Sequence, residues 1–197
     1  MRRGLFVVFE GIDGSGKSSC MRSLAESLSS DMPIQLTAEP SEGPIGAMLR
    51  QDHDLPPMAE TLLFVADRAH HTACIQDWLQ EGRTVLCDRY YASTLAYQSC
   101  SLEGHAGDRE WLWELNRPVV LEPDLTILMD IDPEAGLKRT IGRGESSKFE
   151  KLDFLSRVRQ RYLEIAQERG FMIIDASAEP AVVRAKAEAA IRDRMEV

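Results

Sequence analysis

The residues best suited to chemistry lie near the N-terminus, where a glycine-rich segment ends in a lysine and two serines. Residues 11–18 read GIDGSGKS, which matches the phosphate-loop spacing G-x-x-x-x-G-K-[ST] at every fixed position. Glycines let main-chain amides approach phosphate oxygens, and the positive end of a following helix adds to the attraction. Lys17 is expected to reach the β and γ phosphates, and the Ser18 hydroxyl to ligate magnesium. The predicted triphosphate site comprises Gly11, Ile12, Asp13, Gly14, Ser15, Gly16, Lys17, Ser18 and Ser19.

The segments on either side of this loop fit a strand followed by a helix, which is the setting that the motif requires. The apolar run at residues 6–9 (FVVF) is typical of a buried strand. After the loop, an apolar residue recurs at helical spacing, at Met21, Leu24, Ala25 and Leu28. A glycine-rich turn without a ligand is the alternative, and these flanks make it the weaker interpretation.

Two other groups of residues could bind a second molecule. Asp88 and Arg89 directly follow the apolar run TVLC, so the arginine could hold a phosphate and the aspartate could orient magnesium, water or substrate. Phe64 and Arg68 are four residues apart and share one helix face, where a flat base could stack and form hydrogen bonds. The alternatives are a surface ion pair and a core phenylalanine beneath a solvated arginine. For the second group alone, that alternative is favoured.

A basic stretch that contains glycines lies between two helical patterns, at residues 138–150 (KRTIGRGESSKFE). Arg139 and Arg143 lie beside its glycines, as a lid that closes over phosphates would require. We therefore expect a short basic lid at about residues 142–150, with a solvated connecting loop as the alternative.

Strand-like and helix-like segments alternate along the chain, which predicts an α/β fold around a mainly parallel sheet. The expected strands are residues 6–9, 33–39, 84–88, 125–132 and 171–176. Besides the helix after the phosphate loop, the expected helices are residues 58–80, 108–116, 133–141, 149–168 and 180–195. Ligands bind beyond the carboxyl ends of the strands in such sheets, so we expect a second site beside the triphosphate.

Composition limits the class of protein. A chain of 197 residues with 44% hydrophobic content predicts one domain over residues 1–197. The net charge of −9 argues against a nucleic-acid partner. The four cysteines show no C-x-x-C spacing, which favours reduced thiols in a cytoplasmic protein. No apolar stretch reaches the ~20 residues that cross a bilayer, so no membrane partner is expected.

In combination, the motifs make the chain similar to the thymidylate kinases, which transfer a phosphoryl group from ATP to dTMP. The similar segments occur in the family's order over nearly the whole chain: FEGIDGSGKSS, TAEPSEGPIGAMLR, LLFVADRAHH, DRYYASTLAYQ, PDLTILMDIDPEAGLKR and KFEKLDFLSRVRQRYLEIA. The resemblance implies a P-loop nucleoside-monophosphate kinase fold, a three-layer arrangement of five parallel strands flanked by helices, and commonly a homodimer. It implies conversion of dTMP to dTDP with ATP and Mg²⁺, in dTTP synthesis.

The resemblance also assigns roles to individual residues. Asp13 would contact the 3′-hydroxyl of dTMP, Phe64 would stack on thymine, and Arg68 would bind thymine O4. Arg89 would hold the acceptor phosphate, and Asp88 would lie near magnesium and the transferring phosphate. The remaining residues implied at the substrate site are Glu39, Pro40, Leu49, Ser93, Thr94, Tyr97 and Glu150.

Two positions depart from the family's pattern. Many members have arginine where this chain has Ala38, and Arg50 is a candidate to replace it. Some relatives carry a basic residue inside the phosphate loop, where this chain has Gly14. The missing charge is therefore expected from Arg139 and Arg143, as in the subgroup that uses lid arginines.

Two other classes of protein share the phosphate-loop motif. Another P-loop nucleoside-monophosphate or deoxynucleoside kinase is the nearest alternative, but Arg89 favours an acceptor that carries a phosphate. A GTP-dependent switch would need an Asn-Lys-x-Asp motif, and the only asparagine, Asn116, is followed by arginine. His70 and His71 are adjacent and point in different directions on a helix, so we expect them at the surface or an interface.

Overall fold

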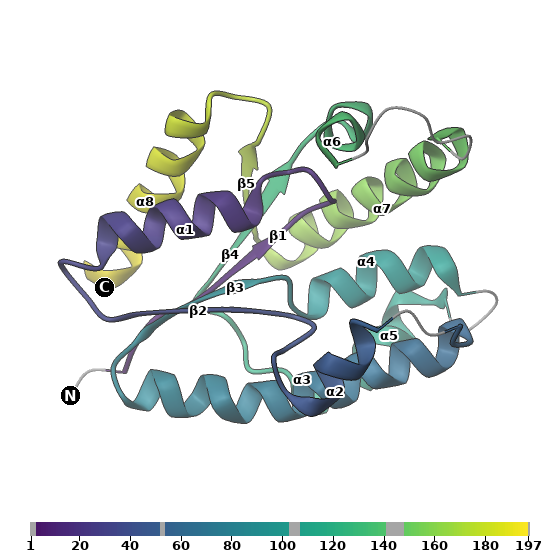
Figure 1. Ribbon diagram of the computed structural model, residues 1–197, viewed down its shortest axis with the longest axis horizontal. Helices are drawn as coiled ribbons and strands as arrows, with labels where there is room; N and C mark the ends of the chain where they lie inside the picture. Colours follow the sequence, from purple (N-terminus) through teal and green to yellow (C-terminus); the bar gives the residue numbers. More distant parts are fainter. Residues whose placement is uncertain (1–2, 52–53, 103–106, 141–147, 197) are drawn as a thin grey trace.

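A computed structural model describes residues 3–51, 54–102, 107–140 and 148–196. At its centre is a parallel sheet of five strands (Figure 1), in the order β2-β3-β1-β4-β5. The strands are β1 (Phe6–Glu10), β2 (Ile34–Ala38), β3 (Thr84–Asp88), β4 (Leu125–Asp130) and β5 (Met172–Asp175). The predicted α/β fold with five parallel strands is confirmed, and each strand lies within two residues of the expected range.

The burial of each strand follows from its place in the sheet. All residues of the central strand β1 are buried, because helices cover both faces there. The edge strands β2 and β5 are less covered and expose Leu36 and Ile173. β2 is also the one expected strand that is not a continuous apolar run.

Helices form the outer layers of the fold. They are α1 (Lys17–Leu28), α2 (Pro44–Leu49), α3 (Pro57–Gln80), α4 (Tyr91–Ser101), α5 (Arg109–Asn116), α6 (Pro133–Thr140), α7 (Lys148–Arg169) and α8 (Pro180–Glu196). Figure 1 shows α1 and α8 side by side on one face of the sheet, with α3, α4 and α7 on the other. Among the described residues, no helix is both long enough and apolar enough to cross a membrane.

Two of these helices were not predicted. α2 has only six residues, too few to show a helical period. α4 begins directly after the Asp88–Arg89 pair, and its first residues form no side-chain cap of their own. The usual sequence signal of a helix start is therefore missing.

The carboxyl ends of the strands bring distant residues to one edge of the sheet. The phosphate loop follows β1, Glu39 follows β2, and Asp88 and Arg89 lie at the end of β3. This edge is the place where ligands bind in open α/β sheets.

Candidate active site

The phosphate loop has the backbone conformation that its glycines allow. Gly16 caps α1 with a φ of 88°, and Gly14 has a φ of 81°, both in the left-handed region that favours glycine. A Cβ atom added at Gly14 would lie 2.1 Å from the carbonyl oxygen of Gly136 in α6. The loop and α6 thus touch through their main chains, and a side chain at position 14 has no space. A basic side chain at position 14 would therefore not fit this arrangement of the loop and α6.

Lys17 holds the loop in this structure. Its Nζ donates hydrogen bonds to Gly11 O at 2.9 Å, Ile12 O at 3.2 Å and Ser15 Oγ at 3.4 Å. Burial lowers the pKa of Lys17 to about 8, and the nearby positive charge of Arg89 acts in the same direction. A triphosphate in the loop would replace these neutral acceptors with charged ones and favour the ammonium.

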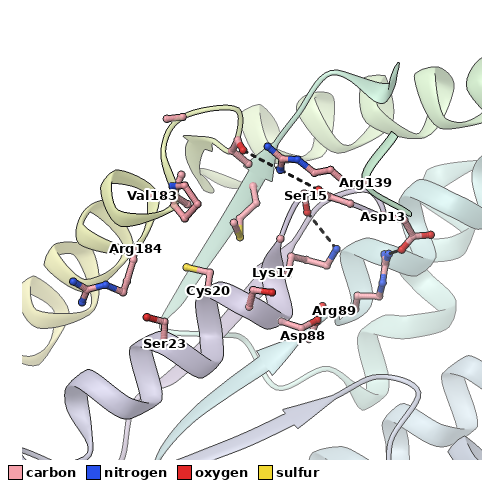
Figure 2. Close-up of a pocket in the computed structure, with 18 of the residues that line it drawn as sticks. Asp13, Ser15, Lys17, Cys20, Ser23, Asp88, Arg89, Arg139, Val183 and Arg184 are labelled. Carbon is pink, nitrogen blue, oxygen red and sulfur yellow. Dashed lines mark hydrogen bonds and ion pairs between the residues drawn. The ribbon is translucent and has the colours of Figure 1, made fainter. Parts of the chain in front are cut away.

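A large cavity opens beside the loop. It has a volume of about 960 Å³ and extends from the phosphate loop to the segment 176–184 before and within α8. Figure 2 shows Asp13 and Arg89 meeting at one end of this cavity and Arg184 at the other. A phosphate chain at the loop would therefore leave room for a nucleoside toward α8. We call this space the donor cavity.

Arg139 also faces the donor cavity (Figure 2). It lies in the last turn of α6 and donates hydrogen bonds to Gly14 O at 3.2 Å and Ala176 O at 3.3 Å. An exposed guanidinium next to the phosphate loop can reach the phosphates of a bound nucleotide. Arg143, the other predicted lid arginine, lies outside the described residues, as does most of the predicted lid.

Ser18 and Asp88 lie next to one another at the loop. The Ser18 hydroxyl donates a hydrogen bond of 2.5 Å to Asp88 Oδ2. Magnesium in phosphoryl-transfer sites takes hard oxygen ligands, with one or two carboxylates beside water and phosphate oxygens. The hydroxyl and the carboxylate fit such an ion. Among the described residues, no cluster of three or more His, Cys, Asp or Glu side chains could hold a metal without a nucleotide.

Arg89 stands between the donor cavity and a second, smaller one. Its backbone has a φ of 69°, which is uncommon for a residue with a side chain. Its guanidinium donates to Asp13 Oδ1 at 2.6 Å and lies 5.0 Å from the centre of the Tyr97 ring. It also donates to Ser93 Oγ at 3.2 Å and to the Tyr162 hydroxyl at 3.3 Å. Contacts on several sides fix the guanidinium at the junction of the cavities.

The smaller cavity has a volume of about 320 Å³, and we call it the acceptor cavity. Asp13, Glu39 and Arg89 line both cavities. The structure brings to the acceptor cavity most of the predicted substrate residues: Asp13, Glu39, Pro40, Phe64, Arg68, Arg89, Ser93, Thr94 and Tyr97. They come from the phosphate loop, the end of β2, α3, the end of β3 and α4.

Arg68 is a buried residue rather than a solvated one. Its Nε and Nη2 donate to Glu39 Oε2 at 3.0 and 2.6 Å, and Nη2 also donates to Thr94 Oγ1 at 3.1 Å. Its Nη1 donates to Asn116 Oδ1. Of its five N–H groups, one on Nη1 has no hydrogen bond among these contacts. The alternative interpretation, a core phenylalanine with a solvated arginine, is therefore wrong for Arg68.

Three residues that were expected to serve the site line neither cavity. Leu49, on α2, and Glu150, exposed in the first turn of α7, do not line either cavity. Arg50 donates to the main-chain oxygens of Pro40 and Ser41, so it braces the loop after β2 rather than entering the site.

The position of His71 contradicts the expectation that it lies at the surface or an interface. Only 2% of this residue is exposed. Its Nδ1 lies 3.2 Å from Glu39 Oε1 and its Nε2 lies 2.7 Å from Thr37 Oγ1. The prediction that both histidines lie at the surface is wrong for His71 and right for His70, which is exposed.

Sequence reasoning missed three buried polar residues that support the site. Glu10 contacts the start of α4, Tyr162 contacts Arg89, and Asn116 contacts Arg68. Glu10 directly follows the predicted strand 6–9, and this position is a weak signal, because a carboxylate there is either exposed or fully paired. Tyr162 and Asn116 lie far along the chain from their partners and carry no local signal.

The fold and the two joined cavities define the class of protein. The phosphate loop lines the larger donor cavity, and Arg89, at the end of β3, lines both cavities. The smaller acceptor cavity is lined by the Phe64 ring and the buried Arg68 guanidinium. This is the arrangement of a P-loop nucleoside-monophosphate kinase.

Comparisons with known proteins narrow the class to a family. A family model described as thymidylate kinase matches residues 9–187. A probable thymidylate kinase of Methanosarcina acetivorans is 41% identical over 187 residues, which are 90% of each chain. A probable thymidylate kinase of Pyrobaculum aerophilum is 41% identical over 91% of this chain and 92% of its own. A thymidylate kinase of Carboxydothermus hydrogenoformans is 37% identical over 90% and 92%. The chain belongs to the thymidylate kinase family.

Proposed function

We propose that this protein transfers the γ-phosphoryl group of ATP to dTMP and releases dTDP and ADP. The observation that carries the proposal is the junction of the two cavities at Asp13 and Arg89. A triphosphate on the loop and a monophosphate in the acceptor cavity would meet at this point. The names of the similar proteins support thymine as the acceptor base.

Positioning and charge neutralisation account for most of the catalysis in phosphoryl transfer. An oxygen of the dTMP phosphate attacks the γ phosphorus, and the bond from that phosphorus to the β-γ bridging oxygen breaks, with ADP leaving. The attacking oxygen is already an anion near neutral pH, so no general base is needed. Lys17 and Arg89 both line the donor cavity, and they stabilise the charge that spreads over the transferring group.

The acceptor nucleoside fits the smaller cavity. Phe64 lines this cavity and is proposed to stack on thymine. The N–H of Arg68 Nη1 that is left over after the bond to Asn116 is proposed to donate to an oxygen acceptor such as thymine O4. Asp13, which binds Arg89 in this structure, exchanges that partner for the 3′-hydroxyl of the sugar. Arg89 is then free to bind the acceptor phosphate in a bidentate manner.

Mg²⁺ is proposed as the cofactor, held by Ser18 and Asp88 together with phosphate oxygens. When bound, it neutralises charge on the β and γ phosphates. The hydrogen bond between Ser18 and Asp88 keeps both oxygen ligands at the loop before the nucleotide arrives.

Arg139 and Arg143 are proposed to complete the charge around the transferring group as the segment 142–150 closes. The position of Arg139 beside Gly14 O supports this role. Closure would exclude water and limit hydrolysis of ATP.

A homodimer is proposed as the working form. Leu62 on α3 and Met48 on α2 are each 48% exposed, and these two helices pack together. Such apolar residues suit a contact with a second copy of the chain. Sedimentation at micromolar concentration should give the mass of two chains, and a monomer would contradict the proposal.

One experiment tests the proposed reaction. The protein is incubated with ATP, Mg²⁺ and each of dTMP, dUMP, dCMP, dGMP and AMP, and the diphosphates are measured. We expect dTMP to have the highest kcat/KM. dUMP should react detectably, because one methyl group in an apolar pocket is worth only ~1–3 kcal/mol. Equal kcat/KM for dCMP and dTMP would contradict the assignment.

A further inference from the structure

Glu10 is a buried carboxylate that the proposed mechanism does not use. It is the last residue of β1, directly before the phosphate loop, and is fully buried. It accepts four hydrogen bonds from two other elements of the fold. A buried charge is costly unless it is fully paired, so a carboxylate here needs an explanation.

One oxygen of Glu10 caps α4. Oε1 accepts from the main-chain N–H groups of Tyr90 at 2.9 Å and Ser93 at 3.2 Å. These amides lie at the helix start, where no side chain of α4 caps them, and the Ser93 N–H also donates to Tyr90 O at 3.1 Å. A negative charge at this end is also favoured by the helix dipole. Glu10 therefore fixes α4 next to Arg89.

The other oxygen sets the direction of two hydroxyl groups. Oε2 accepts from Ser93 Oγ at 2.7 Å and from the Tyr162 hydroxyl at 3.0 Å. Those two hydroxyl oxygens are 2.7 Å apart, and both accept a hydrogen bond from Arg89 Nη1. A carboxylate only accepts, so it draws both hydroxyl protons into this cluster and leaves oxygen lone pairs facing Arg89.

We propose that Glu10 is a positioning residue for the acceptor phosphate, because it holds Ser93 and Tyr162 as acceptors for the Arg89 guanidinium. The proposal rests on the proposed function, in which Arg89 binds that phosphate. Arg89 Nη2 reaches Asp13 and the cavity junction while Nη1 stays on the two hydroxyls. Glu10 thus determines where the guanidinium lies without touching a substrate.

Glutamine at this position has the shape of glutamate but the wrong hydrogen-bond pattern. If its amide NH₂ faces Ser93 and Tyr162, it donates to both hydroxyls, and their protons turn toward Arg89. If it is reversed, the NH₂ faces the N–H groups of Tyr90 and Ser93. Either orientation places donors against donors, at the hydroxyls or at the start of α4.

The test compares binding of dTMP with binding of thymidine, which lacks the phosphate. Calorimetric titrations give both dissociation constants for the wild type and for Glu10→Gln. We expect dTMP binding to weaken on the order of tenfold, because charge-assisted hydrogen bonds to the phosphate are misplaced. Thymidine binding should change less than twofold, and so should KM for ATP.

A second variant protects the test if Glu10→Gln does not fold. Tyr162→Phe removes one of the two hydroxyls and should lower the ratio of dTMP to thymidine affinity in the same direction, by a smaller factor. Tyr91→Phe is the matched control. Tyr91 is a neighbouring buried tyrosine that packs on Trp113 and Tyr90 and does not touch Arg89, so it should leave the ratio unchanged.

The outcomes separate this inference from the proposed function. An unchanged ratio in folded Glu10→Gln or Tyr162→Phe would overturn the inference, as would an equal loss of dTMP and thymidine binding. If the wild-type protein prefers another monophosphate, the proposed function fails. The same comparison, made with that monophosphate and its nucleoside, still decides the role of Glu10.

Discussion

Replacing Arg68 by methionine should affect stability as well as recognition. Methionine keeps an unbranched apolar chain but removes every N–H donor. The change leaves Glu39 with His71 and without its cation, and leaves Asn116 Oδ1 without the donor it has here. The side chains of Arg68 and Glu39 are only 1% and 3% exposed, so water cannot replace the lost partner.

The size of the effect follows from this burial. Breaking a buried ion pair by removing one partner costs about 3–5 kcal/mol of unfolding free energy. For a chain of this length each kcal/mol lowers Tm by roughly 2–4 °C, so we expect a decrease of roughly 6–20 °C. Replacing both partners, as in Arg68→Met with Glu39→Gln, removes the unpaired charge. The double variant should recover at least half of the loss.

Two assays on the same variants separate stability from recognition. Denaturant unfolding followed by circular dichroism gives the free energies. Steady-state kinetics with dTMP and dCMP gives the discrimination, which both variants should lose because neither carries the guanidinium proposed to bind thymine O4. A loss below about 1 kcal/mol in Arg68→Met would refute the buried-pair reasoning. Wild-type discrimination in the double variant would refute the recognition role.

Three other changes test the donor side of the site. Lys17→Ala should lower kcat by a factor on the order of hundreds or more, because a charge at the transferring group is lost; near-normal turnover in the folded variant would remove Lys17 from that role. The pKa of Lys17 is about 8 and its charged form is the active one, so kcat/KM for ATP should fall as pH rises above 8. Bound phosphates favour the ammonium, so the fall in kcat should come at higher pH; a flat kcat/KM profile to pH 9.5 would contradict this. Arg139→Ala should slow turnover while dTMP affinity, measured by titration, changes little; a pure loss of dTMP binding would place Arg139 in the acceptor site instead.

The sheet could be predicted well from the sequence because its signals are local. A buried parallel strand is a continuous apolar run, and the long helix α3 ends where Gly82, with a φ of 79°, follows it. α4 gave no such signal. Its cap comes from Glu10, which lies eighty positions earlier in the sequence than Tyr90.

The residues of the candidate site also fall into two groups, those with a local sequence signal and those without one. The phosphate loop is one contiguous motif, so its residues could be named in advance. The environment of Arg68 could not, because Glu39, Thr94 and Asn116 come from three other segments. His71 was misplaced for the same reason, since adjacent histidines on a helix say nothing about which of them faces a buried carboxylate.

The close approach of Gly14 to Gly136 has a consequence for how this family can change over evolutionary time. A residue larger than glycine at position 14 would require α6 to move away, and α6 carries Arg139. An arginine in the phosphate loop and an arginine on α6 are therefore two mutually exclusive ways to place a positive charge at the transferring group. A single substitution cannot convert one arrangement into the other. Positions 14, 136 and 139 should vary together among relatives. A designer who moves the charge into the loop must first remodel the start of α6.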